Sequence, residues 1–87
     1  MTYTMRLTSR ARKQYRRLDK TDQQRINQAL DKLAVNPRPA GVKALVGVAG
    51  ALRIRVGDLR IAYEIHDQKL VILVFYLAHR GDDYRSL

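Results

Sequence analysis

Two short segments of alternating apolar and polar residues, 52–56 and 59–63, flank a Gly57-Asp58 pair. Alternation with a period of two is typical of half-buried strands, and a Gly-X pair suits a two-residue hairpin with a type II′ turn. In the register that this turn sets, three pairs of residues face one another: Val56 and Leu59, Arg55 and Arg60, and Arg53 and Ala62. The pattern therefore predicts a β-hairpin with three arginines on one face.

The N-terminal part of the chain predicts a strand followed by two helices. Residues 2–7 alternate weakly, and Ser9 can cap a helix over about 10–18. Residues 21–24 (Thr-Asp-Gln-Gln) match a capping box for a second helix, which Asn36-Pro37 should end. The apolar positions recur at helical spacing in both segments: Ala11, Tyr15 and Leu18, then Ile26, Ala29, Leu30 and Leu33. We therefore expect a helical hairpin that turns one apolar face of each helix to a common core.

The rest of the chain predicts a loop and a final buried strand. Residues 37–50 contain both prolines and three of the five glycines, so they should form a loop. Residues 70–77 are apolar throughout, as expected of a central strand covered on both faces. Tyr63 should point into the core and Tyr76 is expected there too. The predicted fold is a single α+β domain over residues 1–87 with the order β-α-α-β-β-β, a helical hairpin packed on a small antiparallel sheet.

The net charge of the chain limits the classes of partner that it can bind. Its 87 residues include 17 Lys and Arg against 8 Asp and Glu, a formal net charge of +9. This excess predicts attraction to phosphate backbones or to an acidic protein. The chain has no cysteine, which excludes disulfides and thiolate chemistry and fits a reducing cytoplasm. The longest apolar run, 70–78, is too short to cross a membrane, so we expect a soluble cytoplasmic protein that does not bind membranes.

Two basic surfaces are candidates for binding a polyanion. Like charges that face each other across a strand pair weaken a sheet. The stacked arginines of the hairpin are therefore better explained as a functional surface than as the ordinary polar face of an edge strand. The second surface lies on the first predicted helix, opposite its apolar stripe, and is either a solvated face or a surface that contacts phosphates: Arg12, Lys13, Arg16, Arg17 and Lys20. The two histidines and the scattered carboxylates form no recognisable metal-ligand set, so no metal or other cofactor is expected.

The hairpin and the C-terminal motifs together resemble those of a known family. Residues 55–65 read R-x-G-D-x-R-x-x-Y-x-I, 77–80 read Leu-Ala-His-Arg, and Tyr84-Arg85 follow. This combination resembles the RelE/ParE superfamily of bacterial toxins from type II toxin–antitoxin modules, with the RelE branch favoured. The resemblance implies a ribosome-dependent mRNA endoribonuclease that cuts in the decoding site, inhibits translation and arrests growth. It also implies a cognate, RelB-like antitoxin whose C-terminal segment is acidic or amphipathic.

The resemblance assigns roles to three residues. Arg60 would hold the scissile phosphate, and Arg80 would stabilise the transition state or protonate the leaving group. Tyr84 would stack on or orient the target nucleotide. The implied reaction is attack of the RNA 2′-OH on the adjacent phosphate, leaving a 2′,3′-cyclic phosphate and a 5′-OH. This reaction needs no metal, but it needs charge stabilisation, a base and an acid.

Two positions depart from the family pattern. Arg53 and Arg55 stand where the best-known pattern has lysines. A lysine can be tuned to act as a base, whereas arginine stays protonated in proteins. The residue that acts as the general base is therefore not assigned. Glu64 shares the face of the arginines by strand parity, and His79 has a suitable pKa range but should point to the face opposite Arg80.

Two other functions remain open from the sequence. One keeps the fold without catalysis, as a ParE-like inhibitor of DNA gyrase that acts through a protein–protein contact. Arg80 and Tyr84 argue against this function, since a gyrase inhibitor does not need them. The other is a non-catalytic basic module that only binds nucleic acid, which the loss of the family's lysines favours.

Overall fold

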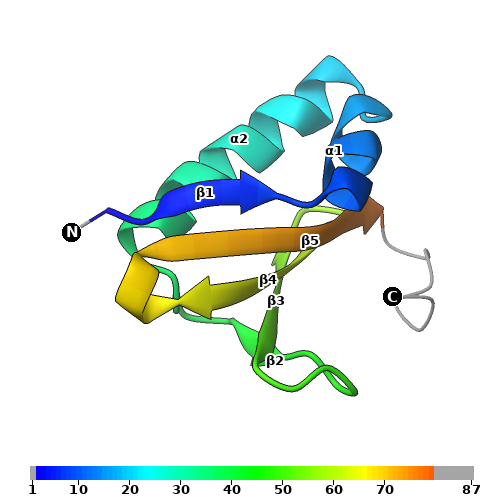
Figure 1. Cartoon of the computed structure of the whole chain (residues 1–87). Helices are drawn as coiled ribbons and strands as arrows, with labels where there is room; N and C mark the ends of the chain where they lie inside the picture. The colour runs from blue at the N-terminus through cyan, green and yellow to red at the C-terminus, as the bar shows by residue number, and fades with distance from the viewer. Residues whose placement is uncertain (1, 80–87) are drawn as a thin grey trace.

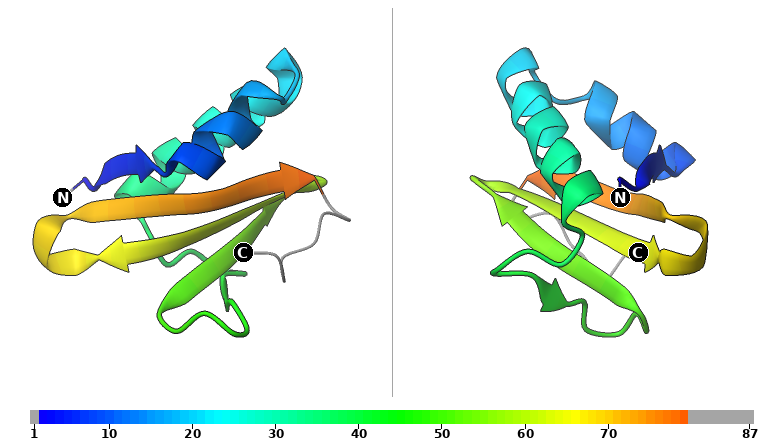
Figure 2. Two further views of the ribbon diagram at one scale, coloured as in Figure 1. Left: turned by 45° about the vertical axis from the view of Figure 1, so that its right-hand side comes forward. Right: turned by 90° about the vertical axis from the view of Figure 1, so that its left-hand side faces the viewer.

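The computed structural model describes residues 2–79 as a five-stranded sheet with two helices on one face (Figure 1). In chain order the elements are β1 (Thr4–Leu7), α1 (Ser9–Arg16), α2 (Lys20–Val35), β2 (Lys43–Ala44), β3 (Ala51–Val56), β4 (Leu59–His66), the 3₁₀ turn η1 (Asp67–Lys69) and β5 (Val71–His79). Both helices lie on the same side of the sheet, as the two views of Figure 2 show. The predicted α+β class and the predicted order of elements are confirmed.

The first helix starts one residue earlier than predicted. Its N-cap is Thr8 and not Ser9, because the Thr8 Oγ1 accepts a hydrogen bond of 3.2 Å from the backbone N–H of Ala11. Thr8 has extended backbone angles, and an extended residue with a side-chain oxygen is what an N-cap requires. Ser9 is the first helical residue.

The capping box predicted for the second helix is wrong. The cap is Asp19, whose Oδ1 accepts a hydrogen bond of 2.8 Å from the backbone N–H of Asp22. An aspartate at this position also places negative charge at the positive end of the helix dipole, which gives it an advantage over Thr21. The helix ends at Asn36-Pro37, as predicted.

The sheet has the strand order β1-β5-β4-β3-β2 and is mixed. The prediction of an antiparallel sheet is wrong at one edge, where β1 runs parallel to β5. Parallel strands need a long crossover connection, and here residues 8–70, with both helices and β2 to β4, connect β1 to β5. Residues 37–50 form the expected loop except for the two-residue strand β2, which pairs with β3.

The arginine-bearing hairpin has the predicted register. Three pairs face one another across β3 and β4: Val56 and Leu59, Arg55 and Arg60, and Arg53 and Ala62. Gly57 has a φ of +58°, whereas Asp58 does not have a positive φ, the combination that a type II′ turn requires. The turn therefore fixes which residues of β3 and β4 share a face.

Apolar side chains cover both faces of the sheet. The main core fills the space between the helices and the sheet and includes Ile26, Leu33 and Tyr63. The hydroxyl of Tyr63 donates a hydrogen bond of 2.8 Å to the carbonyl oxygen of Pro37. A smaller cluster lies on the other face, and its members are Leu45, Ala51, Ala62, Tyr76 and Ala78. The central strand β5 therefore contributes to two apolar layers, as its unbroken apolar run predicts.

Three polar side chains join the N-terminus, the segment after α2 and the turn between β4 and β5. Tyr3 donates a hydrogen bond of 2.6 Å to Asp67, and Arg38 donates to both carboxylate oxygens of Asp67, at 3.3 Å and 2.8 Å. The bonds from Arg38, and then that from Tyr3, hold the pKa of Asp67 below its ordinary value. The charged form of Asp67 is therefore favoured in the folded state.

We expect Asp67→Asn to flatten the acid side of the stability profile. A carboxylate whose pKa is depressed by folding contributes stability above its unfolded pKa, and this contribution is lost as the pH falls through the folded pKa. The change in melting temperature of wild-type protein below about pH 4 should therefore be larger than that of the variant. Thermal unfolding followed by circular dichroism at a series of pH values measures this. Identical acid profiles would show that the cluster does not couple to folding.

No helix within residues 2–79 is long and apolar enough to cross a membrane.

Candidate functional site

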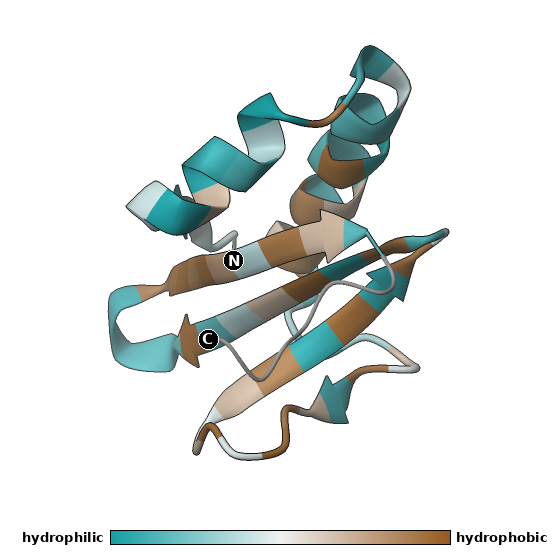
Figure 3. Ribbon diagram, turned by 90° about the vertical axis from the view of Figure 1, so that its right-hand side faces the viewer, coloured by the Kyte–Doolittle hydropathy of each residue, from teal (hydrophilic) through white to brown (hydrophobic). Residues whose placement is uncertain are grey.

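Three arginines gather on the side of the sheet that faces away from the helices. Arg55 and Arg60 are direct partners across β3 and β4, and Arg53 lies two residues along the same face. Their neighbours in the register, Ala62 and Ala78, belong to the apolar cluster on this side. The alternating hydrophilic and hydrophobic bands of the sheet strands are visible in Figure 3. We call Arg53, Arg55 and Arg60 the arginine face.

The arginine face combines exposed and shielded guanidinium groups. Arg55 is exposed, Arg53 and Arg60 are partly buried, and the Nε of Arg60 is shielded from solvent. Partial burial limits the rotamers of Arg60, so less side-chain entropy is lost when it binds a ligand. The planar fork of arginine matches the geometry of a phosphate group. The face is therefore suited to hold a phosphodiester and to stabilise extra negative charge on it.

Glu64 lies on the same face, as predicted, but far from Arg60. It is four residues further along β4, which corresponds to about 13 Å. Its Oε1 is 3.4 Å from the Nε2 of His66, and its register partner Ala51 lies at the far end of β3. A phosphate held by Arg60 would therefore be out of reach of this carboxylate.

His79 turns away from the arginine face. It pairs with Leu59, which belongs to the core beneath the helices. Its Nε2 lies 3.1 Å from the Oδ2 of Asp22, a mostly buried side chain in the first turn of α2. As predicted, His79 does not share the face of the arginines, and its nearest charged neighbour is a carboxylate of the helical layer.

A fourth arginine, Arg10, was not predicted at the site. Its guanidinium carbon lies 5.5 Å from the ring centroid of Tyr76, and the 2% exposed Tyr76 belongs to the apolar cluster next to the arginines. Tyr76 pairs with Ala62, which in turn pairs with Arg53. The alternation along β5 indicates which face of the sheet Tyr76 lies on. Its position relative to the arginine face, however, depends on the register of β3, β4 and β5 and does not follow from the sequence.

The cations predicted on the first helix are all exposed. Residues three, four or seven apart are neighbours on a helix surface. Around α1 the cations therefore follow one arc, from Arg12 through Arg16, Lys13 and Arg17 to Arg10. Lys20 is the first residue of α2. The remaining predicted site residues, Arg80 and Tyr84, are outside the described residues.

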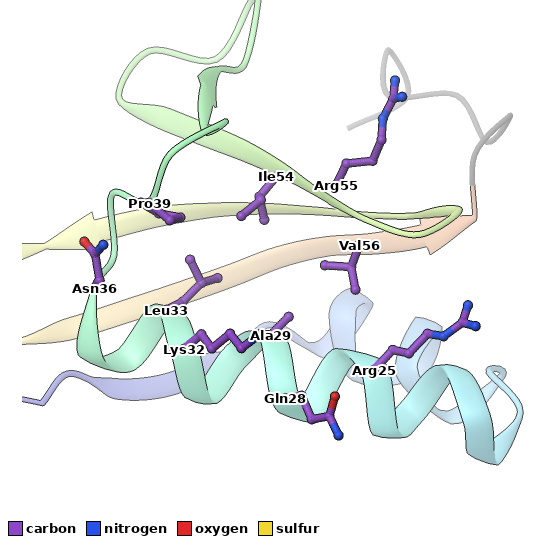
Figure 4. A pocket seen from close by; sticks show the side chains of 10 residues that line it. All are labelled: Arg25, Gln28, Ala29, Lys32, Leu33, Asn36, Pro39, Ile54, Arg55 and Val56. Carbon is purple, nitrogen blue, oxygen red and sulfur yellow. The ribbon is translucent and has the colours of Figure 1, made fainter.

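A groove of about 470 Å³ runs between α2 and β3, on the helix side of the sheet edge (Figure 4). Its floor is apolar and its rim is basic. The apolar lining is Ala29, Leu33, Pro39, Ile54 and Val56, and the basic lining is Arg25, Lys32 and Arg55. In Figure 4 the side chain of Arg55 extends away from α2, so this member of the arginine face also borders the groove.

A model of a protein family described as the ParE toxin of the type II toxin–antitoxin system parDE matches residues 5–84. The chain belongs to this toxin family. Among curated proteins, none matches the toxin significantly. Within residues 2–79, the toxin has no group of three or more His, Cys, Asp or Glu residues that could hold a metal ion.

Solved structures of RelE proteins share the fold of the toxin. A chain of the RelBE2 toxin–antitoxin complex from Mycobacterium tuberculosis is 27% identical with a TM-score of 0.81, covering 92% of this chain and 100% of that one. A chain of the archaeal RelE–RelB complex from Pyrococcus horikoshii is 28% identical with a TM-score of 0.79, and the match covers 95% of this chain and 100% of that one. A chain of the intact RelBE complex from E. coli is 24% identical with a TM-score of 0.79, and the match covers 93% of this chain and 99% of that one. The predicted membership of the RelE/ParE superfamily is confirmed.

Proposed function

We propose that the toxin is a ribosome-dependent mRNA endoribonuclease that acts in the cytoplasm and inhibits translation. The observation that carries the proposal is the arginine face, because like charges that face each other across a hairpin weaken the sheet. A phosphodiester laid against Arg55 and Arg60 removes that repulsion. The face also places the charge that a phosphoryl-transfer transition state requires.

In the proposed reaction, the RNA 2′-oxygen forms a bond to phosphorus while the bond from phosphorus to the 5′-oxygen breaks. The products are a 2′,3′-cyclic phosphate and a 5′-OH. Arg60 holds the scissile phosphate, and Arg53 and Arg55 stabilise the negative charge of the phosphorane. Arg80 and Tyr84, assigned from the family resemblance, would complete the site by stabilising the leaving group and orienting the nucleotide.

The arginine face itself supplies no base. Arginine stays protonated, Glu64 lies about 13 Å along the strand from Arg60, and His79 lies beside Asp22 on the other side of the sheet. The proton of the 2′-OH must therefore pass to a group outside the arginine face. This requirement agrees with a toxin that cuts only on the ribosome, because the ribosome brings further groups to the RNA.

An antitoxin is the partner that follows from membership of this family. We propose a RelB-like protein with an acidic or amphipathic segment that folds on binding. The groove between α2 and β3 has the apolar floor and the basic rim that such a segment requires. Binding there would also neutralise part of the +9 charge.

The second candidate is inhibition of DNA gyrase through a protein–protein contact. The observation that favours it is the family description, which names ParE and not RelE. The arginine face argues for the nuclease instead, since a protein contact does not require stacked guanidinium groups. A third candidate, a module that only binds nucleic acid, gains weight from the arginines at the two lysine positions. Absence of growth arrest on expression would favour this third candidate.

Brief expression in a bacterial host should produce new mRNA 5′ ends within minutes. The cuts should be confined to translated regions and follow the reading frame, because the ribosome presents one codon at a time. Arg80→Ala should remove them. Mapping of 5′ ends across the transcriptome measures both results. Growth arrest with intact mRNA and broken DNA would contradict the nuclease and establish the gyrase inhibitor.

A further inference from the structure

A surface depression of about 360 Å³ on α1 has the composition of an anion site. Four residues line it: Arg10, Lys13, Gln14 and Arg17. Three of these side chains are cationic and the fourth is an amide, and none of the four is acidic. Concave surfaces lined by one sign of charge concentrate counter-ions of the opposite sign. The lining therefore selects for a negatively charged ligand.

Gln14 fixes the wall of the depression and offers a donor. Its Oε1 accepts a hydrogen bond of 2.9 Å from the backbone N–H of Leu77 on β5. A backbone N–H can only donate, so the oxygen of the amide must face the strand. The NH₂ group is then the part of this amide that remains for another acceptor. The depression thus combines three cations with a donor held against the sheet.

Arg10 links the depression to the arginine face. It lines the depression, and its guanidinium also lies over the ring of Tyr76. Tyr76 and Ala62 are register partners, and Ala62 faces Arg53. Arg10 and the three arginines of β3 and β4 therefore lie along one side of the sheet, with the buried Ala62 and Tyr76 between Arg53 and Arg10. The contact with the ring also restricts Arg10, which lowers the entropy cost of binding.

Two of the five cations predicted to bind RNA line the depression, Lys13 and Arg17. Arg12 lies on the opposite side of α1 from Arg10, and Arg16 lies between Arg12 and Lys13 around the helix. Lys20 is the first residue of α2. These three cations do not line the depression.

We propose that the depression formed by Arg10, Lys13, Gln14 and Arg17 binds a backbone phosphate of single-stranded RNA that continues from the arginine face. The inference deepens the proposed function, on which it rests for the identity of the polyanion. The position of the three further arginines on the same side of the sheet favours a nucleic acid over an acidic peptide, because a strand of regularly spaced phosphates can contact both the depression and the arginine face at once.

The test compares two variants that lose equal charge. One is Arg10→Gln with Lys13→Gln and Arg17→Gln, and the other is Arg12→Gln with Arg16→Gln and Lys20→Gln. The probe is a fluorescent 2′-O-methyl RNA of about ten nucleotides, which cannot be cleaved because its 2′-oxygen is blocked. Anisotropy titrations at several salt concentrations give the affinity and the slope of log affinity against log salt. Circular dichroism checks that both variants are folded.

The first variant should bind on the order of tenfold more weakly, and its salt slope should be shallower by about 0.7, the contribution of one phosphate contact of a single strand. The second variant should show a clearly smaller loss of affinity and a clearly smaller change in the salt slope. Arg10→Lys should lose part of the affinity because it keeps the charge without the planar fork. Equal losses in the two triple variants, or none in the first, would overturn the proposal.

An acidic peptide that bound wild-type protein but not the first variant, while the RNA bound both equally well, would assign the depression to a protein partner instead and would overturn the proposal. Because the probe is not cleaved, this result is independent of nuclease activity. A toxin without mRNA cleavage could still show the difference between the two variants, and an active nuclease could lack it.

Discussion

Arg60→Ala should reduce cleavage of ribosome-bound mRNA by about a hundredfold to a thousandfold, the usual cost of removing one pre-positioned charge-stabilising group. Arg60 is partly buried and faces Arg55 across the hairpin. Its removal takes away both the proposed ligand of the scissile phosphate and a repulsive partner of Arg55. The variant should therefore lose activity and keep its fold. Cleavage rates in a reconstituted translation reaction, with thermal unfolding of the same samples, measure the two effects.

The matched controls separate charge from position. Arg25→Ala removes an exposed arginine from α2, on the other side of the sheet, and should cut at close to the wild-type rate. Arg60→Lys keeps the charge but not the bidentate fork, so its rate should fall between wild type and Arg60→Ala. Cleavage by Arg60→Ala at the wild-type rate would show that the chemistry takes place elsewhere on the toxin.

The second large effect is on stability. Tyr63→Ala should lower the free energy of unfolding by about 3–5 kcal/mol, since it leaves a cavity among fully buried side chains. Tyr63→Phe keeps the ring but leaves the carbonyl of Pro37 without its hydrogen bond, which should cost about 1–3 kcal/mol. Urea unfolding at neutral pH gives both values. Equal losses in the two variants would show that the ring is not what stabilises this part of the core.

The raised pKa of Tyr63 also predicts how stability changes at alkaline pH. Burial raises its pKa from 10.0 to about 12, against a smaller lowering effect of Arg38. A group whose pKa is raised by folding contributes stability below its unfolded pKa and loses this contribution as the pH rises through the folded value. Wild-type protein should therefore lose stability between pH 10.0 and about 12. Tyr63→Phe should show a smaller loss over the same range.

The hairpin could be predicted in detail because every local signal agreed. Alternation set the two strands, and Gly57 fixed the turn. Where two signals competed, the prediction was wrong. Thr8 and Ser9 are both good caps, as are Asp19 and Thr21, and the choice depends on which oxygen reaches the free N–H groups. The parallel pairing of β1 left no trace in the sequence, because alternation does not encode strand direction.

The candidate site was predictable only within one hairpin. Arg53, Arg55 and Arg60 share a face because of local parity, so their arrangement follows from the sequence. Arg10 reaches the same surface through the packing of α1 on β5, a contact between residues far apart in the chain. Parity also placed His79 on the opposite side, but the proximity of Asp22 depends on how α2 packs and could not be predicted.

The facing pair of Arg55 and Arg60 has a thermodynamic consequence for the free toxin. Mobile anions screen their repulsion, so salt should raise the melting temperature of the protein while it weakens attachment to RNA. A bound polyanion acts in the same direction as the anions and stabilises the folded state through its own binding free energy. The toxin is therefore least stable when it is alone in dilute buffer, and each anionic partner that covers the hairpin adds to its stability.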